Sequence, residues 1–241
     1  MPAIRAAPRV MGVIAGWDPS GGAGMLADVA TAQALQVRTL GLVSCLTAQS
    51  LQHWAHVQAT DSALLEAQMR CLQRDPLPPV WKVGALGSAA NSQALAQWLG
   101  AQRPKPTVVL DPILHSSSAG QLGMAAWLQP WLPLKPLLCP NSAEWEHIGT
   151  QLPAASQCPR LITDAPHGAR LYSPDDAAIE FEYTRRPGEW RGTGCTLATL
   201  IAIALSAELP TAQACGFGLA QLQSWLAQSA PPHIQRRPEA M

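Results

Sequence analysis

The sequence predicts a doubly wound α/β fold, in which a mostly parallel sheet carries helices on both faces within a single domain. Short apolar runs, typical of buried parallel strands, alternate along the chain with longer segments of helical character. The first run, at 10–15, leads through a glycine-rich loop into a helix, which is how this fold begins. The length of 241 residues suits one large domain of this class.

The elements follow in order from apolar runs, helical spacing and turn residues. The helix after Ser62 stops before a run of prolines, because proline cannot continue a helix. After Thr196, apolar residues recur at the spacing of one helix face. The predicted strands are 10–15, 39–46, 80–86, 107–110, 134–139 and 160–164, with a hairpin of 169–172 and 178–183. The predicted helices are 25–35, 62–74, 91–99, 195–208 and 212–228, and a further helix can start near Asn141.

The charge balance argues against nucleic acid as a partner. Lys plus Arg and Asp plus Glu each number 16, and no long basic run occurs. Charged residues make up 13% of the chain, whereas about a quarter is usual for a soluble domain. We therefore expect the chain to form a homo-oligomer, a dimer, in which part of this weakly charged surface is covered.

The cysteines and the termini place the chain in a reducing compartment. None of the six cysteines forms a Cys-x-x-Cys pair or has a histidine at zinc-ligand spacing. We find no signal peptide and no apolar stretch of about 18 residues, so we expect a cytoplasmic protein with no membrane contact. Residues 1–230 are expected to form the domain, and the proline-rich 231–241 a loose tail.

The segment 191–199 carries the clearest chemical signal. Gly192, Thr193 and Gly194 precede an apolar helix, so their N–H groups point from the positive end of a helix dipole and favour a phosphate. A thiol at such a position has a lowered pKa, so we expect Cys195 to be partly thiolate. Glycine loops before helices also occur without a ligand, and a lone cysteine often packs as a small hydrophobe.

Polar residues follow other predicted strands at the edge where parallel strands place their sites. Asp111 ends one strand, and the polar run 47–50, with Gln49, ends another. Asn141 and Glu144 are three residues apart and share a helix face. Their oxygens suit Mg²⁺ held through water and phosphate, but the pair taken alone favours a helix capping box.

Several segments in this order resemble the bacterial hydroxymethylpyrimidine/phosphomethylpyrimidine kinases of thiamine biosynthesis, in the ribokinase-like superfamily. The resemblance rests on motifs that span nearly the whole chain. They are Ala-Gly-Trp-Asp-Pro-Ser-Gly-Gly-Ala-Gly at 15–24 with Asp28, Leu-Thr-Ala-Gln-Ser at 46–50, Lys-Val-Gly-Ala-Leu-Gly-Ser at 82–88, Val-Val-Leu-Asp-Pro at 108–112, Pro-Asn-Ser-Ala-Glu at 140–144 and Gly-Thr-Gly-Cys-Thr-Leu at 192–197.

The resemblance implies a kinase that uses ATP and Mg²⁺. Its substrates would be 4-amino-5-hydroxymethyl-2-methylpyrimidine and the monophosphate of that pyrimidine. By position in the motifs, the pyrimidine pocket would contain Gly16, Asp28, Gln49 and Ile113. Asn141 and Glu144 would hold Mg²⁺ and phosphate with Asp111 near the metal, while residues 192–194 would form the anion hole and Cys195 the base.

The chain departs from the family on the nucleotide side. Arg191 stands where His is usual, the Lys-Gly-Gly-His run is replaced by Thr-Asp-Ala-Pro-His-Gly at 163–168, and the expected lid at 113–120 has serines at 116–118 in place of Lys. We expect Arg191 to supply the missing positive charge to the nucleotide. Two other functions stay open, a pyridoxal or pyridoxine kinase and a catalytically weak sensor that binds the pyrimidine. Gly-Thr-Gly-Cys rather than Gly-Thr-Gly-Asp argues against the first, and the retained Asn141, Glu144 and Cys195 argue against the second.

Overall fold

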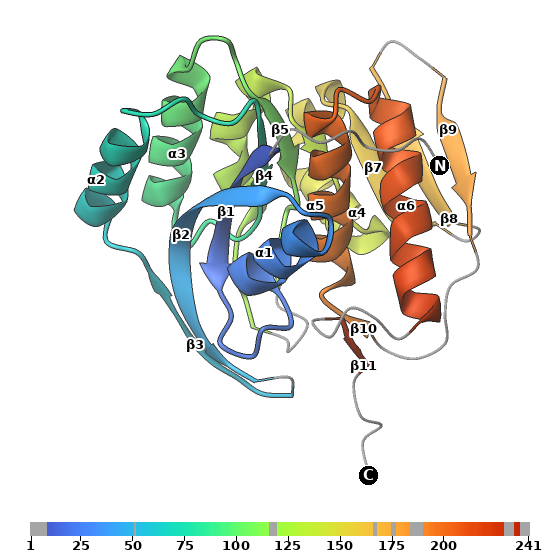
Figure 1. Cartoon of the computed structure of the whole chain (residues 1–241), viewed down its shortest axis with the longest axis horizontal. Coiled ribbons are helices and arrows are strands. Elements are labelled where there is room, and N and C mark those ends of the chain that lie inside the picture. Colours follow the sequence, from blue (N-terminus) through green and yellow to red (C-terminus); the bar gives the residue numbers. More distant parts are fainter. Residues whose placement is uncertain are drawn as a thin grey trace.

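The chain folds around one sheet with helices on both sides, as the computed structural model in Figure 1 shows. The structure describes residues 9–50, 52–115, 120–165, 168–174, 177–183, 190–228 and 234–236. Among these residues, no helix combines the length and apolar character needed to cross a membrane. The predicted α/β class, with a mostly parallel sheet and helices on both faces, is confirmed.

The main sheet has nine strands among the described residues. In spatial order they are β3 (Trp54–Ala59), β2 (Arg38–Gln49), β1 (Val10–Trp17), β4 (Val80–Val83), β5 (Thr107–Leu110), β6 (Leu137–Leu138), β7 (Arg160–Ala165), β8 (Gly168–Tyr172) and β9 (Ile179–Glu182). The six strands from β2 to β7 are parallel, and β3, β8 and β9 are antiparallel to their neighbours. The carboxyl ends of the parallel strands therefore meet at one edge, where this fold places its sites.

Helices connect the strands and close both faces of the sheet. They are α1 (Gly24–Ala34), α2 (Ser62–Leu72), α3 (Ala89–Ala101), α4 (Ser142–Gln151), α5 (Thr193–Ser206) and α6 (Thr211–Ala227), with 3₁₀ helices η1 (Ala125–Leu134) and η2 (Pro153–Gln157). Three begin at the side-chain caps expected of helix starts. Asp61, Ser88 and Asn141 accept the backbone N–H three residues later at the starts of α2, α3 and α4.

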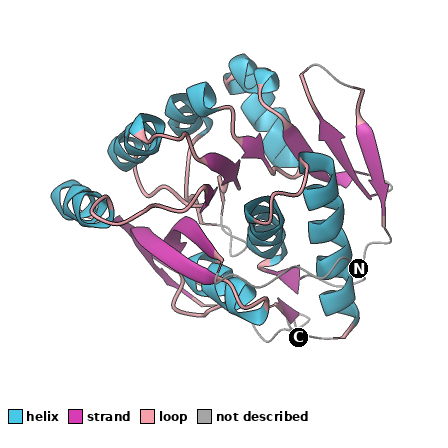
Figure 2. Ribbon diagram, turned by 45° about the horizontal axis from the view of Figure 1, so that its top comes forward, coloured by secondary structure: helices cyan, strands magenta, loops and turns pink. Residues whose placement is uncertain are grey.

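Successive residues of each central strand face two separate hydrophobic cores. Val13 of β1 packs with α1, α5 and α6, whereas Ile14 packs with α2, α3, α4 and η1. This alternation fixes which helices lie on which side of the sheet (Figure 2). Every residue from Cys195 to Ala204 is buried, so α5 is apolar on all sides and lies in the middle of the first core.

Most predicted elements agree with the structure within a few residues, and the differences lie in short elements. The strand predicted at 134–139 is only Leu137–Leu138, because η1 extends to Leu134. Strand β3 was not predicted, and a two-stranded sheet of β10 (Trp190–Arg191) and β11 (Gln235–Arg236) forms outside the main one. Residues 234–236 thus belong to the fold, which corrects the expected loose tail at these positions.

Candidate active site

A cavity of about 1030 Å³ lies where the parallel strands end and α5 begins. Its volume exceeds what one small ring needs and accommodates two ligands side by side. Nearly all of the predicted site residues line this cavity. They are Gly16, Gln49, Asp111, Ile113, Asn141, Glu144, Arg191, Gly192, Thr193, Gly194 and Cys195.

The start of α5 forms part of the cavity wall, as predicted for an anion-binding loop. Gly192 caps the helix with a φ of +79°, a conformation that side chains other than glycine adopt only with strain. The next N–H groups, from Thr193 to Cys195, have no partner within the helix. They therefore present donors, and the positive end of the helix dipole, to whatever occupies the cavity.

Cys195 does not have the lowered pKa that its sequence position predicts. Burial raises the pKa of this thiol well above its usual range, and the carboxylates of Asp111 and Asp28 raise it further. Lys82 and the backbone N–H of Gly24 act in the opposite direction without reversing the shift. The thiol hydrogen-bonds the Asp111 carboxylate, so Cys195 is a protonated thiol with an acceptor beside it.

Asp28 lies behind the cavity wall and not on it, contrary to the prediction. Its side chain is fully buried, with Oδ2 at 2.8 Å from Nζ of Lys82 and Oδ1 accepting the hydroxyl of Thr199 at 2.8 Å. Burial raises the pKa of Asp28, although Lys82 and Thr199 favour its charged form. Asp28 therefore acts on the site through Lys82, with no direct access to a ligand in the cavity.

Lys82 is a member of this cluster that motif analysis did not single out. Its Nζ also lies 3.9 Å from Oδ2 of Asp111, and its side chain is fully buried. Burial alone lowers the pKa of a lysine, but the charges of Asp28, Cys195 and Asp111 outweigh it and raise the pKa of Lys82. The signal in the sequence is a lysine inside the apolar strand β4, where a charge needs a buried partner.

Asn141 and Glu144 form a complete capping box at the start of α4 and also line the cavity. The side-chain oxygen of Asn141 accepts the N–H of Glu144 at 2.8 Å, and Oε2 of Glu144 accepts the N–H of Asn141 at 3.1 Å. Burial, followed by the charge of Asp111, raises the pKa of Glu144 to about 7. The capping box is therefore confirmed, and the role of this pair in holding Mg²⁺ and phosphate stays a prediction.

Asp111 and Glu144 suit a divalent cation that keeps water or phosphate ligands. Each lines the cavity, and the charge of Asp111 opposes ionisation of Glu144, a repulsion that a cation between them relieves. In the part of the chain that the structure describes, no three His, Cys, Asp or Glu side chains are grouped closely enough to hold a metal alone. The donor set therefore fits Mg²⁺ bound together with a phosphate.

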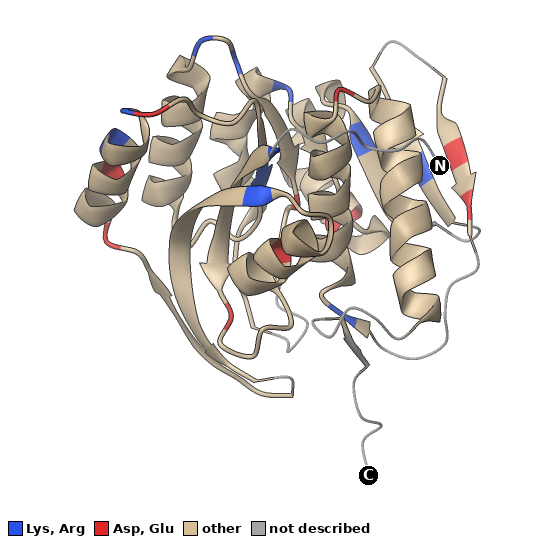
Figure 3. Cartoon of the chain, in the orientation of Figure 1, with Lys and Arg blue, Asp and Glu red and all other residues tan. Residues whose placement is uncertain are grey.

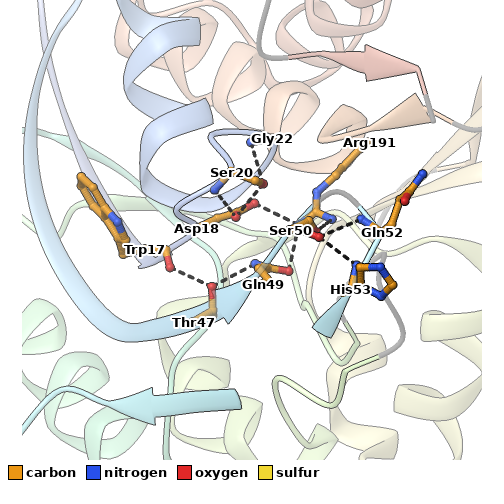
Figure 4. Close-up of polar contacts among 10 residues, drawn as sticks. All are labelled: Trp17, Asp18, Ser20, Gly22, Thr47, Gln49, Ser50, Gln52, His53 and Arg191. Atoms are coloured by element: carbon orange, nitrogen blue, oxygen red, sulfur yellow. Dashed lines mark hydrogen bonds and ion pairs between the residues drawn. The ribbon is translucent and has the colours of Figure 1, made fainter. Parts of the chain in front are cut away.

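The guanidinium of Arg191 binds the segments that follow β1 and end β2. It bonds Oδ2 of Asp18 at 3.0 Å, Oε1 of Gln49 at 2.8 Å and the carbonyl of Ser50 at 2.9 Å (Figure 4). The side chain is buried, and the Asp18 carboxylate matches its charge. The charge of Arg191 is thus matched within the chain, and the expectation that it supplies positive charge to a nucleotide stays a prediction.

The segment that replaces the family's Lys-Gly-Gly-His run adds another acid to the cavity. Asp164 lines it, and its Oδ1 accepts the N–H of Ser142 at 2.8 Å, at the start of α4. The expected lid residues 116–118 lie outside the described residues. Of the described residues that line the cavity, Arg191 is the one lysine or arginine.

Comparison with known proteins identifies relatives in one group of kinases. The family model described as phosphomethylpyrimidine kinase matches residues 18–164. The hydroxymethylpyrimidine/phosphomethylpyrimidine kinase of Rhizobium meliloti is 28% identical over an alignment of 235 positions that covers 88% of each chain.

Solved structures support the fold at lower sequence identity. The phosphomethylpyrimidine kinase of Clostridium difficile superposes with a TM-score of 0.74 and 21% identity, over 90% of this chain and 99% of that one. The pyridoxal kinase of Staphylococcus aureus, in complex with the ATP analogue AMP-PCP, superposes equally well, with a TM-score of 0.74 and 20% identity over 91% and 88% of the two chains. At these identities the superpositions establish the fold and do not identify the substrate.

Proposed function

Because the chain belongs to the phosphomethylpyrimidine kinase family, we propose that it transfers phosphate from ATP to 4-amino-5-hydroxymethyl-2-methylpyrimidine and then to the monophosphate formed. The observation that carries the proposal is the cavity that joins the Gly16–Gln49 side to the Asn141–Glu144 side across the start of α5. Phosphoryl transfer needs both substrates in line and negative charge neutralised between them, and one cavity that spans the start of α5 supports a proposal of this kind.

The acceptor side is proposed to bind the pyrimidine. Gly16, Gln49 and Ile113 line that side, with Gln49 able to donate and accept hydrogen bonds. A side chain at Gly16 would meet Sγ of Cys45 at 2.7 Å, so glycine keeps the backbone there close to its neighbours. We propose that the ring lies between these residues, with its hydroxymethyl group directed at Cys195.

The donor side is proposed to bind ATP with Mg²⁺. Leu219, Leu222 and Leu226 of α6, together with Tyr183 and Trp190, give the cavity an apolar end that suits a nucleotide base. Glu144 and Asp111 would hold Mg²⁺ through the nucleotide phosphates, and the metal would neutralise charge on the phosphate being transferred. The N–H groups at 192–195 are placed to stabilise that charge from the other side.

Cys195 is proposed to accept the proton of the acceptor hydroxyl. Because the thiol is protonated, it must first pass its own proton on, and the Asp111 carboxylate bonded to it is the nearest acceptor. The proposed path is therefore hydroxyl to Cys195 and Cys195 to Asp111. The retained positive charge of Lys82 favours the transient thiolate.

A catalytically weak pyrimidine sensor is the second candidate, and the charges on the donor side favour it. Asp111, Glu144 and Asp164 line the cavity, while the guanidinium of Arg191 is paired with Asp18. A nucleotide would then depend on Mg²⁺ for most of its charge neutralisation. We propose the kinase because the thiol of Cys195, placed beside the N–H groups at 192–195, has no evident use in a protein that only binds the ring, whereas Asn141 and Glu144 also cap α4.

A coupled assay that measures ADP release tests the proposal. It offers MgATP with hydroxymethylpyrimidine, with its monophosphate and with pyridoxal in separate reactions. Turnover of both pyrimidines with a higher kcat/KM than pyridoxal is the expected result. Turnover of pyridoxal alone would show that the enzyme is a pyridoxal kinase. Absence of turnover, in a protein that binds the pyrimidine by calorimetry, would show that it is a sensor.

We propose further that the enzyme acts as a homodimer in the cytoplasm. The low content of charged residues, 13%, supports self-association, and the free cysteines in the described residues support a reducing compartment. Light scattering of the purified protein measures its oligomeric state, and fractionation of the source cells measures its location.

A further inference from the structure

We propose that Arg191 is a positioning residue for the acceptor, and that it governs binding of the pyrimidine and not of the nucleotide. The inference rests on the proposed function, since the acceptor is named there. Figure 4 shows the guanidinium at the centre of a network that joins Asp18, Gln49 and Ser50. Asp18 and Gln49 line the cavity with Gly16, and Ser50 directly follows Gln49 in the chain.

The guanidinium of Arg191 has a geometry that suits several acceptors at once. One terminal nitrogen donates to both Asp18 and Gln49, and the other donates to the carbonyl of Ser50. A planar group with several fixed donors holds three acceptors in one arrangement, which the single ammonium of a lysine cannot do. Arg191 therefore sets the relative positions of the loop after β1 and the end of β2.

The partners of the Gln49 amide fix its orientation. A guanidinium only donates hydrogen bonds, so the amide atom that faces it must be the oxygen. The amide nitrogen then donates to Oγ1 of Thr47 at 3.0 Å, and that hydroxyl donates to the carbonyl of Trp17 at 2.9 Å. With both ends fixed, the amide discriminates between donors and acceptors on a ring, as glutamine does when it reads an adenine edge.

The positive charge of Arg191 is matched by the carboxylate of Asp18. The side chains of Arg191 and Asp18 are 1% and 2% exposed, and they pair at 3.0 Å. The other oxygen of Asp18 accepts the N–H of Ser20 at 2.9 Å and its hydroxyl at 2.7 Å, which organises the turn that follows β1. The positive charge is thus satisfied within the acceptor side of the cavity.

Finally, Arg191 immediately precedes Gly192, the cap of α5. The same residue therefore connects the acceptor side to the anion-binding loop. Its partners Gln49 and Asp18 lie 142 and 173 positions away in the sequence. Loss of the network would displace the acceptor relative to the transferred phosphate while leaving the nucleotide contacts in place.

Steady-state kinetics of Arg191→Lys tests the inference, with Arg170→Lys as the matched control. Lysine keeps the charge beside Asp18, so the fold is preserved while the bond to Gln49 is lost. We expect the KM for hydroxymethylpyrimidine to rise about tenfold, since one lost bond to a charged donor is worth about that factor, with less than a twofold change in the KM for ATP. The exposed side chains of Arg170 and Glu180 pair at 2.6 Å outside the cavity, so replacement of Arg170 should alter neither KM.

A double-mutant cycle separates positioning from general structural support. In a Gln49→Ala background, Arg191→Lys should cost little further in acceptor KM, because its effect acts through the amide. A full tenfold effect in that background would overturn the inference. So would a rise in the KM for ATP alone, or equal changes in both KM values with a lowered melting temperature.

The unaltered protein distinguishes this inference from the proposed function. If it turns over no pyrimidine, the proposed kinase activity is wrong, and calorimetric affinities for hydroxymethylpyrimidine and for MgATP then replace the two KM values. A tenfold loss of ring affinity in Arg191→Lys, with unchanged MgATP affinity, supports the positioning role. Unchanged ring affinity, or no ring binding by the unaltered protein, contradicts it.

Discussion

At the scale of single residues, the thiol of Cys195 lies at the start of α5 and within reach of three charged side chains. The helix end and Lys82 favour a thiolate, whereas burial and the carboxylates of Asp111 and Asp28 oppose it. Burial and the two carboxylates outweigh the other effects and raise the pKa of Cys195, so the resting thiol keeps its proton. A base of this kind works only if its proton leaves as the acceptor is deprotonated.

Cys195→Ala should lower kcat for hydroxymethylpyrimidine by about 10²–10⁴-fold, the usual contribution of a general base. The KM values should change little, because the N–H groups at 192–195 remain. Stopped-time assays at saturating substrate measure the loss. The control is Cys215→Ala, since Cys215 is a buried thiol on α6 that does not line the cavity. A kcat that falls equally in both variants would remove Cys195 from the chemistry.

Glu144 links the site to the pH dependence of stability. Its pKa is about 7 in the folded protein against an ordinary 4.5, because burial and Asp111 disfavour its charge. The folded state therefore binds this proton more tightly than the unfolded chain does. The stabilisation is fully present below about pH 4.5 and is lost as the pH rises through about 7.

Glu144→Gln should therefore stabilise the protein more at pH 8 than at pH 5.5. Glutamine keeps an acceptor for the N–H of Asn141 and cannot ionise, so we expect a gain of about 1–3 kcal/mol at pH 8. Thermal unfolding without divalent cations measures it. Glu146→Gln, on the exposed side of the same helix, is the control. A gain that is the same at both pH values would contradict the assigned cause.

Sequence patterns located the site residues better than they located their partners. Residues at strand ends and helix starts, such as Gln49, Asp111 and Gly192, could be predicted because topology alone brings those positions together. The pairing of Lys82 with Asp28 could not, since it joins residues 54 positions apart inside the core. The direction of the Arg191 side chain was missed for the same reason.

At the scale of elements, periodicity predicted the long segments and failed for the short ones. The apolar face of α5 and the continuous run of β1 carry many residues of one pattern. In η1, Pro130 and Pro133 interrupt helical spacing, so no helix was predicted there. Strand β3 alternates weakly and exists mainly because β2 offers it an edge.

The small sheet of β10 and β11 is the element most directly tied to the anion-binding loop. Trp190 pairs with Arg236 and Arg191 with Gln235, while Ile234 is buried against the first core. Strand β11 therefore holds the residues that lead directly into Gly192.

Ending the chain at Gln228 should destabilise the protein and weaken catalysis. Loss of the buried Ile234 side chain is worth about 1.5–3 kcal/mol, which corresponds to a fall in melting temperature of roughly 3–10 °C at this size. Calorimetry and the kinase assay measure both effects. A chain ending at Arg236 keeps β11 and should behave as the full chain does. Equal behaviour of the two truncated chains would show that β11 does not support the loop.

At the scale of the whole molecule, charge is sparse over large parts of the surface. Figure 3 shows α3 and α6, which both have exposed residues, without a coloured residue. Two large apolar side chains, Trp17 and Leu46, are neighbours across β1 and β2 and are both exposed. A contact between copies that covers this pair agrees with the expected dimer.

Leu46→Lys should therefore shift a dimer toward monomer, as measured by light scattering over a range of protein concentrations. A buried charge in an interface is costly unless it finds a partner. Leu64→Lys is the control, because Leu64 on α2 is 54% exposed against 53% for Leu46 and lies away from the pair. A monomeric unaltered protein, or equal effects of the two substitutions, would contradict this assignment.

We propose that one cavity brings the pyrimidine and MgATP together across the start of α5 and that the enzyme transfers phosphate twice. ³¹P NMR of the unaltered protein, incubated with MgATP and hydroxymethylpyrimidine, tests this directly. We expect a phosphomonoester signal that appears first and a diphosphate signal that replaces it, with ADP formed in step. An unchanged ATP spectrum, in a sample where calorimetry detects binding of the pyrimidine, would contradict it.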